Sequence, residues 1–578
     1  MSITRRSFLK GTSALAVSSV APISIAIPKS AWANSTQSDY RALVCVLLHG
    51  GNDSANMVIP YSGAMHSAYL SKRPDIAYSK GELLPTDCRD NNDVEVGLHP
   101  AMEGVQRLMQ QGLATSIINV GPMLDSNTRP PGSRRHNSMR LAWQSSYSDD
   151  EQRSLHDFGW GGGIMDILSE GHVLPETVAT ASNRLLAGRQ TTSQRINEDG
   201  EFMHLDFFKH SPKGEELFRE YIEQEHRDCP FESQYAFEFD LFFDAYDEYT
   251  AIMDSVDLDD NISGSSSLSR QLRGVKRVID ASEKMGIGGH IFFVQQGGYD
   301  THRNQLSRHN GLLSTLDSAL TEFTEALIAS GVGENVTTFT MSDFGRTTHN
   351  NSNGGTDHGH GGHQLVLGGA VNGGRVYGEF ENMLEAGTSL QATVAHESMA
   401  MTLASWFGAS DTVLNEVFPN AVREFPRNLG FLKGSAVPED ELLPVSEVRA
   451  SHEHRKQWAK YAIDGNVNTK WSGKGKGVSF EMDFTRKSTI SLLRYRLPHT
   501  SWRQYMLKIE AIDSNGQSSI LSETLTPLTE QDYDWVYTSS YRLVSDVKSI
   551  RITHLGNTDA RPDYQGFVGI AELEAWGT

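Results

Sequence analysis

Strand-like apolar runs alternate with helix-like segments through the first three quarters of the chain. The run from Ala42 to Pro60 has the pattern of a buried strand broken by a Gly-Gly-Asn-Asp turn, and residues 289–302 and 335–345 repeat this order of apolar strand and polar turn. Helical apolar spacing occurs at residues 99–112, 270–286, 310–331 and 392–408. This alternation predicts an α/β fold with a mostly parallel sheet.

The pattern changes after residue 431. Residues 432–443 have the composition of a linker, and beyond them helical spacing gives way to short alternating runs such as VSFEMDF, ISLLRYRL and MLKIEAID. Alternation of this kind predicts an all-β sandwich over residues 444–578. A length of 578 residues accommodates both domains.

The N-terminus has the organisation of an export signal. Paired Arg5 and Arg6 precede an apolar stretch from Gly11 to Pro28, and small residues follow at Ala31–Ala33. The segment resembles a twin-arginine signal peptide over residues 1–33, so we expect a periplasmic or secreted protein. The apolar stretch is short and contains serines, which argues against a permanent membrane span.

The overall charge restricts the partners of the chain. Its formal net charge of −21 argues against nucleic acid as the main partner, because phosphate backbones repel an acidic surface. Acidity gives no positive indication of a substrate.

Histidines and aspartates gather where strand-like runs end. His349, His358, His360 and His363 fall within fifteen residues of one glycine-rich loop. Carboxyl ends of parallel strands share one edge of a sheet, and carboxylates with imidazoles bind zinc-like ions. The predicted ligands of a divalent ion of the Zn, Mn or Ca class are Asp53, Asp300, His302, Asp343, Asp357, His358 and His363. A solvated polar loop with structural histidines is the alternative.

Motifs spread over residues 42–431 resemble a known family. They include LLHGGNDSANMVIP, GWGGGIMD, QQGGYDTHRNQ and SDFGRTTHNNSNGGTDHGHGGHQLVLGGAVNGG. In this order they resemble the DUF1501 family of exported bacterial proteins, within the alkaline phosphatase/sulfatase-like superfamily. The resemblance implies a mostly parallel, alkaline-phosphatase-like sheet flanked by helices, with metals at the strand ends. Phe344 stands where the superfamily usually has a ligand histidine, so His358 or His360 would have to replace it.

The resemblance also implies a nucleophile beside the metal. Members of the superfamily use serine, threonine or formylglycine, and residues 127–139 offer candidates next to several arginines. The candidate catalytic residues are Ser133, Ser138, His136 and Arg346, the last to stabilise charge on the transferred group. Thr128 and Ser54 are rivals, and attack by a metal-activated water is a further alternative. The cysteines lack the context of a formylglycine sulfatase.

The C-terminal segment resembles a second family. YAIDGNVNTKWSG and the final FVGIAELEAWG resemble the discoidin, or factor 5/8 type C, modules. The resemblance implies a jelly-roll domain that binds glycans or cell surfaces, with calcium near Asp464, Asn466, Thr469 and Glu572. The alternative interpretation is that DGNVN is an ordinary turn.

These patterns together predict an exported, metal-dependent hydrolase of small phosphate or sulfate esters. Its C-terminal domain would target it to a glycan or a cell-surface polysaccharide. The alternative is a non-catalytic, degenerate member of the superfamily that only binds polysaccharide.

Overall fold

The computed structural model describes two domains. It covers residues 40–125, 128, 134–145, 147, 158–169, 174–189, 191, 193–202, 211–222, 230–435, 441–526, 529, 531–559, 561 and 566–577. The predicted export signal of residues 1–33 and the candidate nucleophile Ser133 lie outside this set.

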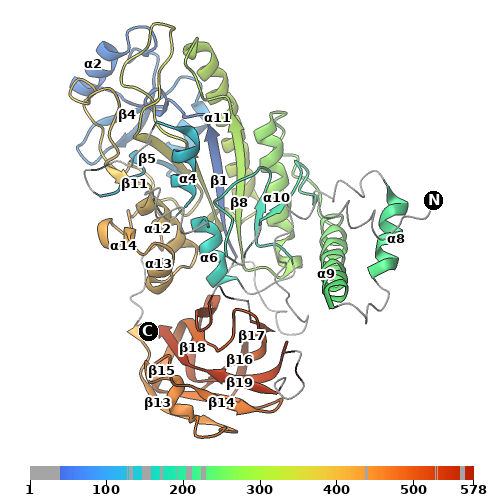
Figure 1. The fold of residues 1–578 in the computed structure, drawn as a ribbon. Helices are drawn as coiled ribbons and strands as arrows, with labels where there is room; N and C mark the ends of the chain where they lie inside the picture. Colours follow the sequence, from blue (N-terminus) through green and yellow to red (C-terminus); the bar gives the residue numbers. More distant parts are fainter. Residues whose placement is uncertain are drawn as a thin grey trace.

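An eight-stranded sheet forms the centre of the large domain (Figure 1). Its order is β11 (Val394–Ala395), β5 (Ala114–Gly121), β10 (Gly362–Leu367), β9 (Val336–Ser342), β1 (Arg41–His49), β8 (Gly289–Gly297), β6 (Thr177–Ala179) and β7 (Gln194–Arg195). β1 runs parallel to β8 and β9, whereas β10 is antiparallel to β5 and β9. The expected α/β architecture is confirmed. The sheet is mixed because β10, which follows the histidine-rich loop, runs antiparallel to its neighbours.

Helices cover both faces of this sheet, because its strands are apolar on both sides. Along β1, Ala42, Val44, Val46 and Leu48 face one core, and Leu43, Cys45 and Leu47 face the other. The first core includes side chains of α3 (Glu103–Gln110), α10 (Ser267–Met285) and α11 (Gln305–Ala329). The second includes side chains of α6 (Trp160–Leu168), α12 (His396–Phe407) and α13 (Asp411–Val417).

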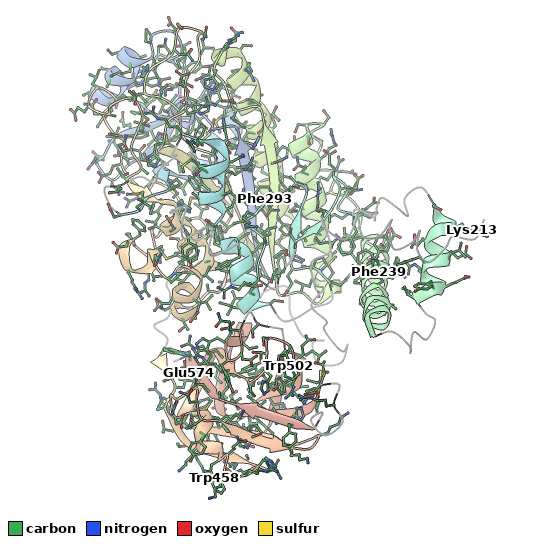
Figure 2. The ribbon with its side chains drawn as sticks, viewed as in Figure 1. Lys213, Phe239, Phe293, Trp458, Trp502 and Glu574 are labelled. Atoms are coloured by element: carbon green, nitrogen blue, oxygen red, sulfur yellow. The ribbon has the colours of Figure 1, made fainter. Side chains whose placement is uncertain are left out.

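Smaller elements complete the large domain. They are η2 (Ser54–Asn56), α2 (Gly63–Lys72), α4 (His136–Gln144), η3 (Gly333–Asn335), α14 (Ala421–Glu424) and a small sheet of β2 (Val58–Pro60), β4 (Glu95–Leu98) and β3 (Leu84–Arg89). Helices α8 (Pro212–Ile222) and α9 (Pro230–Met253) lie to one side and pack on each other through Phe218, Phe239 and Phe243 (Figure 2). No helix among the described residues has the length and apolar character needed to cross a bilayer.

The described residues of the C-terminal domain form strands and one short 3-10 helix, η4 (Ala459–Ala462). Its strands are β12 (Glu441–Leu442), β13 (Val445–Ala450), β14 (Trp471–Lys474), β15 (Ser479–Arg496), β16 (Tyr505–Asp513), β17 (Ser518–Leu525), β18 (Trp535–Asn557), β19 (Phe567–Ile570) and β20 (Glu572–Gly577). Seven form one sheet, and β14 pairs with β19. Trp471, Phe480 and Tyr505 lie in the core between them. The predicted all-β sandwich is confirmed.

The two domains are in direct contact. Trp576 packs against the second core of the large domain, and α6 contacts β18. Arg494 donates from Nη1 to Glu416 Oε1 of α13 over 2.5 Å and also pairs with Glu574 of its own domain. An apolar anchor with an ion pair beside it holds the sandwich against the large domain.

Backbone crowding at the end of β9 yields a stability prediction. A methyl group at Gly345 would lie 1.9 Å from the carbonyl oxygen of Gly361, whereas one at Gly387 meets nothing within 4 Å. We expect Gly345→Ala to lower the free energy of unfolding by more than about 3 kcal/mol, and Gly387→Ala to change it by less than about 0.5 kcal/mol. Urea unfolding of both variants measures the difference. Equal stability of the two would contradict the close packing of the loop on residues 361–362.

Candidate metal centre

Three histidine side chains converge on the carboxylate of Asp300. The Nε2 atoms of His302 and His358 lie 3.1 and 3.3 Å from Asp300 Oδ1, and His136 Nε2 lies 3.8 Å from Asp300 Oδ2. His302 Nε2 and His358 Nε2 are 3.0 Å apart. Two nitrogens bound to one tetrahedral zinc ion lie about 3.3 Å apart, so the spacing is close to that of metal ligands.

The other ring nitrogen of each histidine faces a hydrogen-bond acceptor. His136 Nδ1 lies 2.6 Å from Asp343 Oδ2, and His302 Nδ1 lies 3.0 Å from Asp357 Oδ1. His358 Nδ1 lies 2.9 Å from the backbone oxygen of Arg134. These acceptors hold a proton on Nδ1 and leave the lone pair on Nε2, which is the usual arrangement around histidines that bind a metal.

Electrostatics at the point of convergence favours a cation. Burial lowers the pKa of His358, so this ring is neutral near pH 7. Partial burial alone would raise the pKa of Asp300, but the hydrogen bond and the charge of Arg346 lower it below its ordinary value. The Asp300 carboxylate therefore faces imidazole nitrogens, and a shared proton or a metal ion between them would be stabilised. Asp343 Oδ1, buried and without a hydrogen-bond partner among the described residues, adds to this negative potential.

The fold brings these four side chains together from three elements. Asp300 and His302 follow β8, His358 lies in the loop between β9 and β10, and His136 is the first residue of α4. The parallel pairing of β1 with β8 and β9 places the ends of these strands side by side. The four side chains are 24–46% exposed, so solvent and a small substrate reach the cluster. His136, Asp300 and His358 fit a divalent ion with two histidine ligands and one carboxylate ligand, and His302 Nε2 borders this group.

Arg346 is a structural clamp at this site. Its side chain is fully buried and donates to the backbone oxygens of Gly50, Gly51, Tyr299 and Thr356, and to Asp300 Oδ1. These bonds tie the segments after β1, β8 and β9 together. The role predicted for Arg346, stabilising charge on a substrate, does not fit this position, because its donors already bind the protein.

Asp53 lies outside the cluster. It is fully buried, and Arg73 Nη1 donates to its two oxygens over 2.9 and 2.7 Å, while Gln305 also donates to it. Burial alone would raise the pKa of Asp53, but the charge and hydrogen bonds of Arg73 lower it. The metal-ligand role predicted for Asp53 is therefore corrected: its partner is a buried guanidinium.

The other predicted ligands fall into two groups. Asp343 and Asp357 belong to the site, but in this structure each orients a histidine through Nδ1. His363 is buried away from it, accepts from the backbone N–H of Asn119 over 3.1 Å and has a pKa that burial lowers to about 3. His360 is also buried, with Nε2 2.9 Å from the oxygen of Pro122. Neither His363 nor His360 joins the four-residue cluster.

The candidate nucleophile Ser138 is directed away from the cluster by helix geometry. Two residues along an α-helix correspond to a rotation of about 200°, so Ser138 projects from the side of α4 opposite to His136. Among the described residues, the hydrogen-bond partners of the four cluster side chains include no serine or threonine hydroxyl. This geometry favours the alternative of a metal-activated water.

Two functional residues were missed or misassigned from the sequence. His136 was predicted as a catalytic residue, whereas the structure places it among the possible ligands with Asp300 and His358. Arg73 carried no signal, since a lone arginine after a helix is normally a surface residue. The neighbouring Arg134 contributes only its backbone oxygen to the cluster, which no side-chain pattern reveals.

Comparison with known proteins adds a family match and a fold resemblance. Residues 191–412 match the family model described as "Protein of unknown function (DUF1501)". No curated protein matches the chain.

Three of the similar solved structures contain family 32 carbohydrate-binding modules. Truncated AlyQ with its CBM32 and alginate lyase domains is 19% identical at a TM-score of 0.21, over 24% of this chain and 34% of that one. The CBM32 of AlyQ in complex with 4,5-unsaturated mannuronic acid is 19% identical at a TM-score of 0.20, over 23% of this chain and 97% of that one. The family 32 module of Clostridium perfringens NanJ, in complex with galactose, is 23% identical at a TM-score of 0.20, over 24% and 99%.

A second group of oxygen ligands lies in the C-terminal domain. Asp464 accepts from the backbone N–H of Asn466 over 3.0 Å and from the hydroxyl of Thr469 over 2.9 and 2.8 Å. Glu572 is buried, its Oε2 has no hydrogen-bond partner among the described residues, and burial with the nearby charge of Asp464 raises its pKa to about 7. The carboxylate of Asp464 and the orphaned Oε2 of Glu572 have the chemistry of calcium ligands.

If the cluster binds a metal ion, two histidines of the same loop should behave differently. His358→Ala would remove a candidate ligand and should abolish tight binding of Zn²⁺ or Mn²⁺, whereas His349→Ala, at an exposed position outside the cluster, should bind like the unaltered chain. Asp343→Asn, which weakens the orientation of His136, should lower the affinity about 10–100-fold. Calorimetric titration of the metal-free protein measures all three. Equal affinity in the two alanine variants would contradict the site.

Glu572 predicts a pH-dependent stability of the C-terminal domain without calcium. A carboxyl whose pKa is higher in the folded than in the unfolded state stabilises the fold below its unfolded pKa, and this stabilisation is lost as the pH rises through the folded pKa. With a folded pKa of about 7, we expect the midpoint of thermal unfolding to fall between pH 4.5 and 7. Calcium should restore it at pH 7.5, and Glu572→Gln should remove both effects. Calorimetric scans across this pH range test the prediction.

Proposed function

We propose that this chain is an exported, metal-dependent hydrolase of small phosphate or sulfate esters, with an alkaline-phosphatase-like large domain. The observation that carries the proposal is the convergence of three histidine Nε2 atoms on Asp300 at a solvent-exposed sheet edge. The twin-arginine signal expected over residues 1–33 supports export.

His136, Asp300 and His358 would hold one divalent ion and leave a fourth position for a further ligand. Such an ion polarises an ester oxygen and lowers the pKa of a water molecule. The protein orients its ligands: Asp343, Asp357 and the Arg134 carbonyl fix the Nδ1 protons, and Arg346 holds Asp300 ionised. Because Asp300 remains charged, it offsets the charge of the ion at neutral pH.

Two exposed arginines beside the ligands support an anionic substrate. Arg135 immediately precedes His136, and Arg303 immediately follows His302. Neither forms an ion pair with a described residue, in contrast to the buried Arg73 and Arg346. Free guanidinium groups bind phosphate and sulfate oxygens well, which favours esters of these acids over neutral substrates.

The C-terminal domain supports delivery to a glycan. The sequence resembles modules that bind glycans, and the domain exposes Trp458 and Trp502 on loops, with 42% and 50% of their surfaces accessible. Exposed tryptophans present broad apolar faces with a polar edge, which suits sugar rings. Binding of a cell-surface polysaccharide by this domain is part of the proposal.

Turnover of aryl phosphate and aryl sulfate tests the hydrolase. We expect one ion per chain, activity that a chelator abolishes, and at least about a 100-fold loss in His358→Ala, because the ligand set is broken. Arg135→Ala should raise the KM for the anionic substrate with a smaller effect on kcat. His349→Ala serves as the matched control and should retain activity.

A second candidate function is metal-stabilised binding without catalysis. Two observations favour it. Arg346 donates to backbone oxygens of the protein, and Ser138 projects away from the cluster, so neither side chain is placed for the catalytic role predicted from the sequence. Metal binding at full stoichiometry without turnover of either ester would reject the hydrolase and leave this candidate. Absence of bound metal would reject both.

A further inference from the structure

Five cationic side chains at one end of the C-terminal domain lack ionic partners. They are Arg455, Lys456, Lys460, Lys474 and Lys476, all exposed, and none forms an ion pair with a described residue. Elsewhere in this domain arginines meet carboxylates: Arg449 pairs with Glu481, and Arg503 with Asp559. Residues 452–476 contain six lysines and arginines against two acids, in a chain whose net charge is −21. We call the five residues with Trp458 the distal basic patch.

Hydrogen bonds and ring contacts hold the elements of this patch together. His454 donates its backbone N–H to Ser472 O over 2.8 Å, and its ring lies 5.1 Å from that of Phe567. Lys474 Nζ lies 5.0 Å from the same Phe567 ring. The loop of residues 452–458 therefore lies on β14 and β19, and Figure 2 shows Trp458 at the end of the domain farthest from the large domain.

The tip of this loop has a backbone that its residues disfavour. His454 and Gln457 form an antiparallel bridge, and between them Arg455 and Lys456 have φ angles of 47° and 65°. A two-residue turn with two positive φ angles normally contains Asn-Gly or Asp-Gly, since larger side chains are strained there. Two cations at such positions are unfavourable for the fold, which points to a role in binding.

We infer that the distal basic patch binds a polyanionic polysaccharide, one that carries carboxylate or sulfate groups along the chain. This inference rests on the glycan-binding part of the proposed function and specifies its ligand. The five cations supply the charge, and Trp458 supplies an apolar face for a sugar ring. The acid nearest to the turn, Glu453, is engaged by the backbone N–H of Ala459 over 2.7 Å.

The size of the patch and the charge around it favour a single flexible polymer chain as its ligand. A membrane surface or a long duplex extends beyond the patch and meets the strongly acidic remainder of the protein, which repels it. A polysaccharide strand touches only the tip. Exposed ionic contacts of this kind are screened by salt, so binding should weaken as ionic strength rises.

Binding of dextran sulfate, polygalacturonate and neutral dextran to the full chain tests the inference. We expect both anionic polymers to bind and neutral dextran not to bind. In Arg455→Asn/Lys456→Gly the affinity should fall about fivefold to tenfold, because two exposed ionic contacts are lost. The same variant should unfold at an equal or higher temperature, because its turn now has favoured residues. Weakened binding with retained stability separates recognition from a folding defect.

A second double variant distinguishes binding at this patch from a general effect of the protein's charge. Lys80→Asn/Lys213→Asn removes the same charge from exposed positions of the large domain and should bind like the unaltered chain. Equal losses in both double variants, equal binding of neutral dextran, or equally tight binding of single-stranded DNA or anionic vesicles would each overturn the inference. His358→Ala should bind the polymers normally, so failure of the hydrolase proposal is distinguishable from failure of this one.

Discussion

One guanidinium group organises the functional edge of the large domain. Arg346 donates to three backbone oxygens that follow β1 and β8 and to a fourth within its own loop, so segments distant in sequence share one buried cation. The remaining contact, with Asp300, is the one that reaches the surface. The geometry of the histidine cluster depends on this clamp, because Asp300 is the residue on which the three imidazoles converge.

Two arginine–aspartate pairs at this edge of the sheet have different roles. Arg73 and Asp53 are both fully buried, so their charges serve packing and hold the turn after β1. Arg346 is buried but Asp300 is 46% exposed, so the second pair presents its negative charge to solvent. A buried pair is costly to separate, and an exposed carboxylate next to imidazole nitrogens attracts a cation. The structure thus separates Asp53 from Asp300, two aspartates that the sequence assigned to the same centre.

The periodicity of apolar residues was sufficient to predict the architecture. Burial on both faces of β1 gives a continuous apolar run in the sequence, and burial on one face of the C-terminal strands gives alternating apolar and polar residues. The location of the site at this edge of the sheet was also predictable, since Asp300, His302 and His358 each follow a strand. The roles of the individual residues at the site were not predictable. An aspartate can bind an ion, orient a histidine as Asp343 does, or pair with an arginine as Asp53 does. The outcome depends on contacts outside the local sequence pattern, which join residues 20 positions apart for Asp53 and Arg73 and 207 apart for Asp343 and His136. His136 was placed at the site but given another role for the same reason.

The connection between the domains has a geometric consequence. α4 begins at His136, and near its end the carbonyl of Trp143 accepts from Trp160 of α6, which in turn contacts β18 (Figure 1). Each of these helices has nine residues and is about 13 Å long, so they act as a rigid spacer. A polysaccharide bound at the distal basic patch would thus lie at the end of the sandwich farthest from the large domain (Figure 2). The polymer that anchors the protein and the molecule that reaches the histidine cluster would then be different molecules.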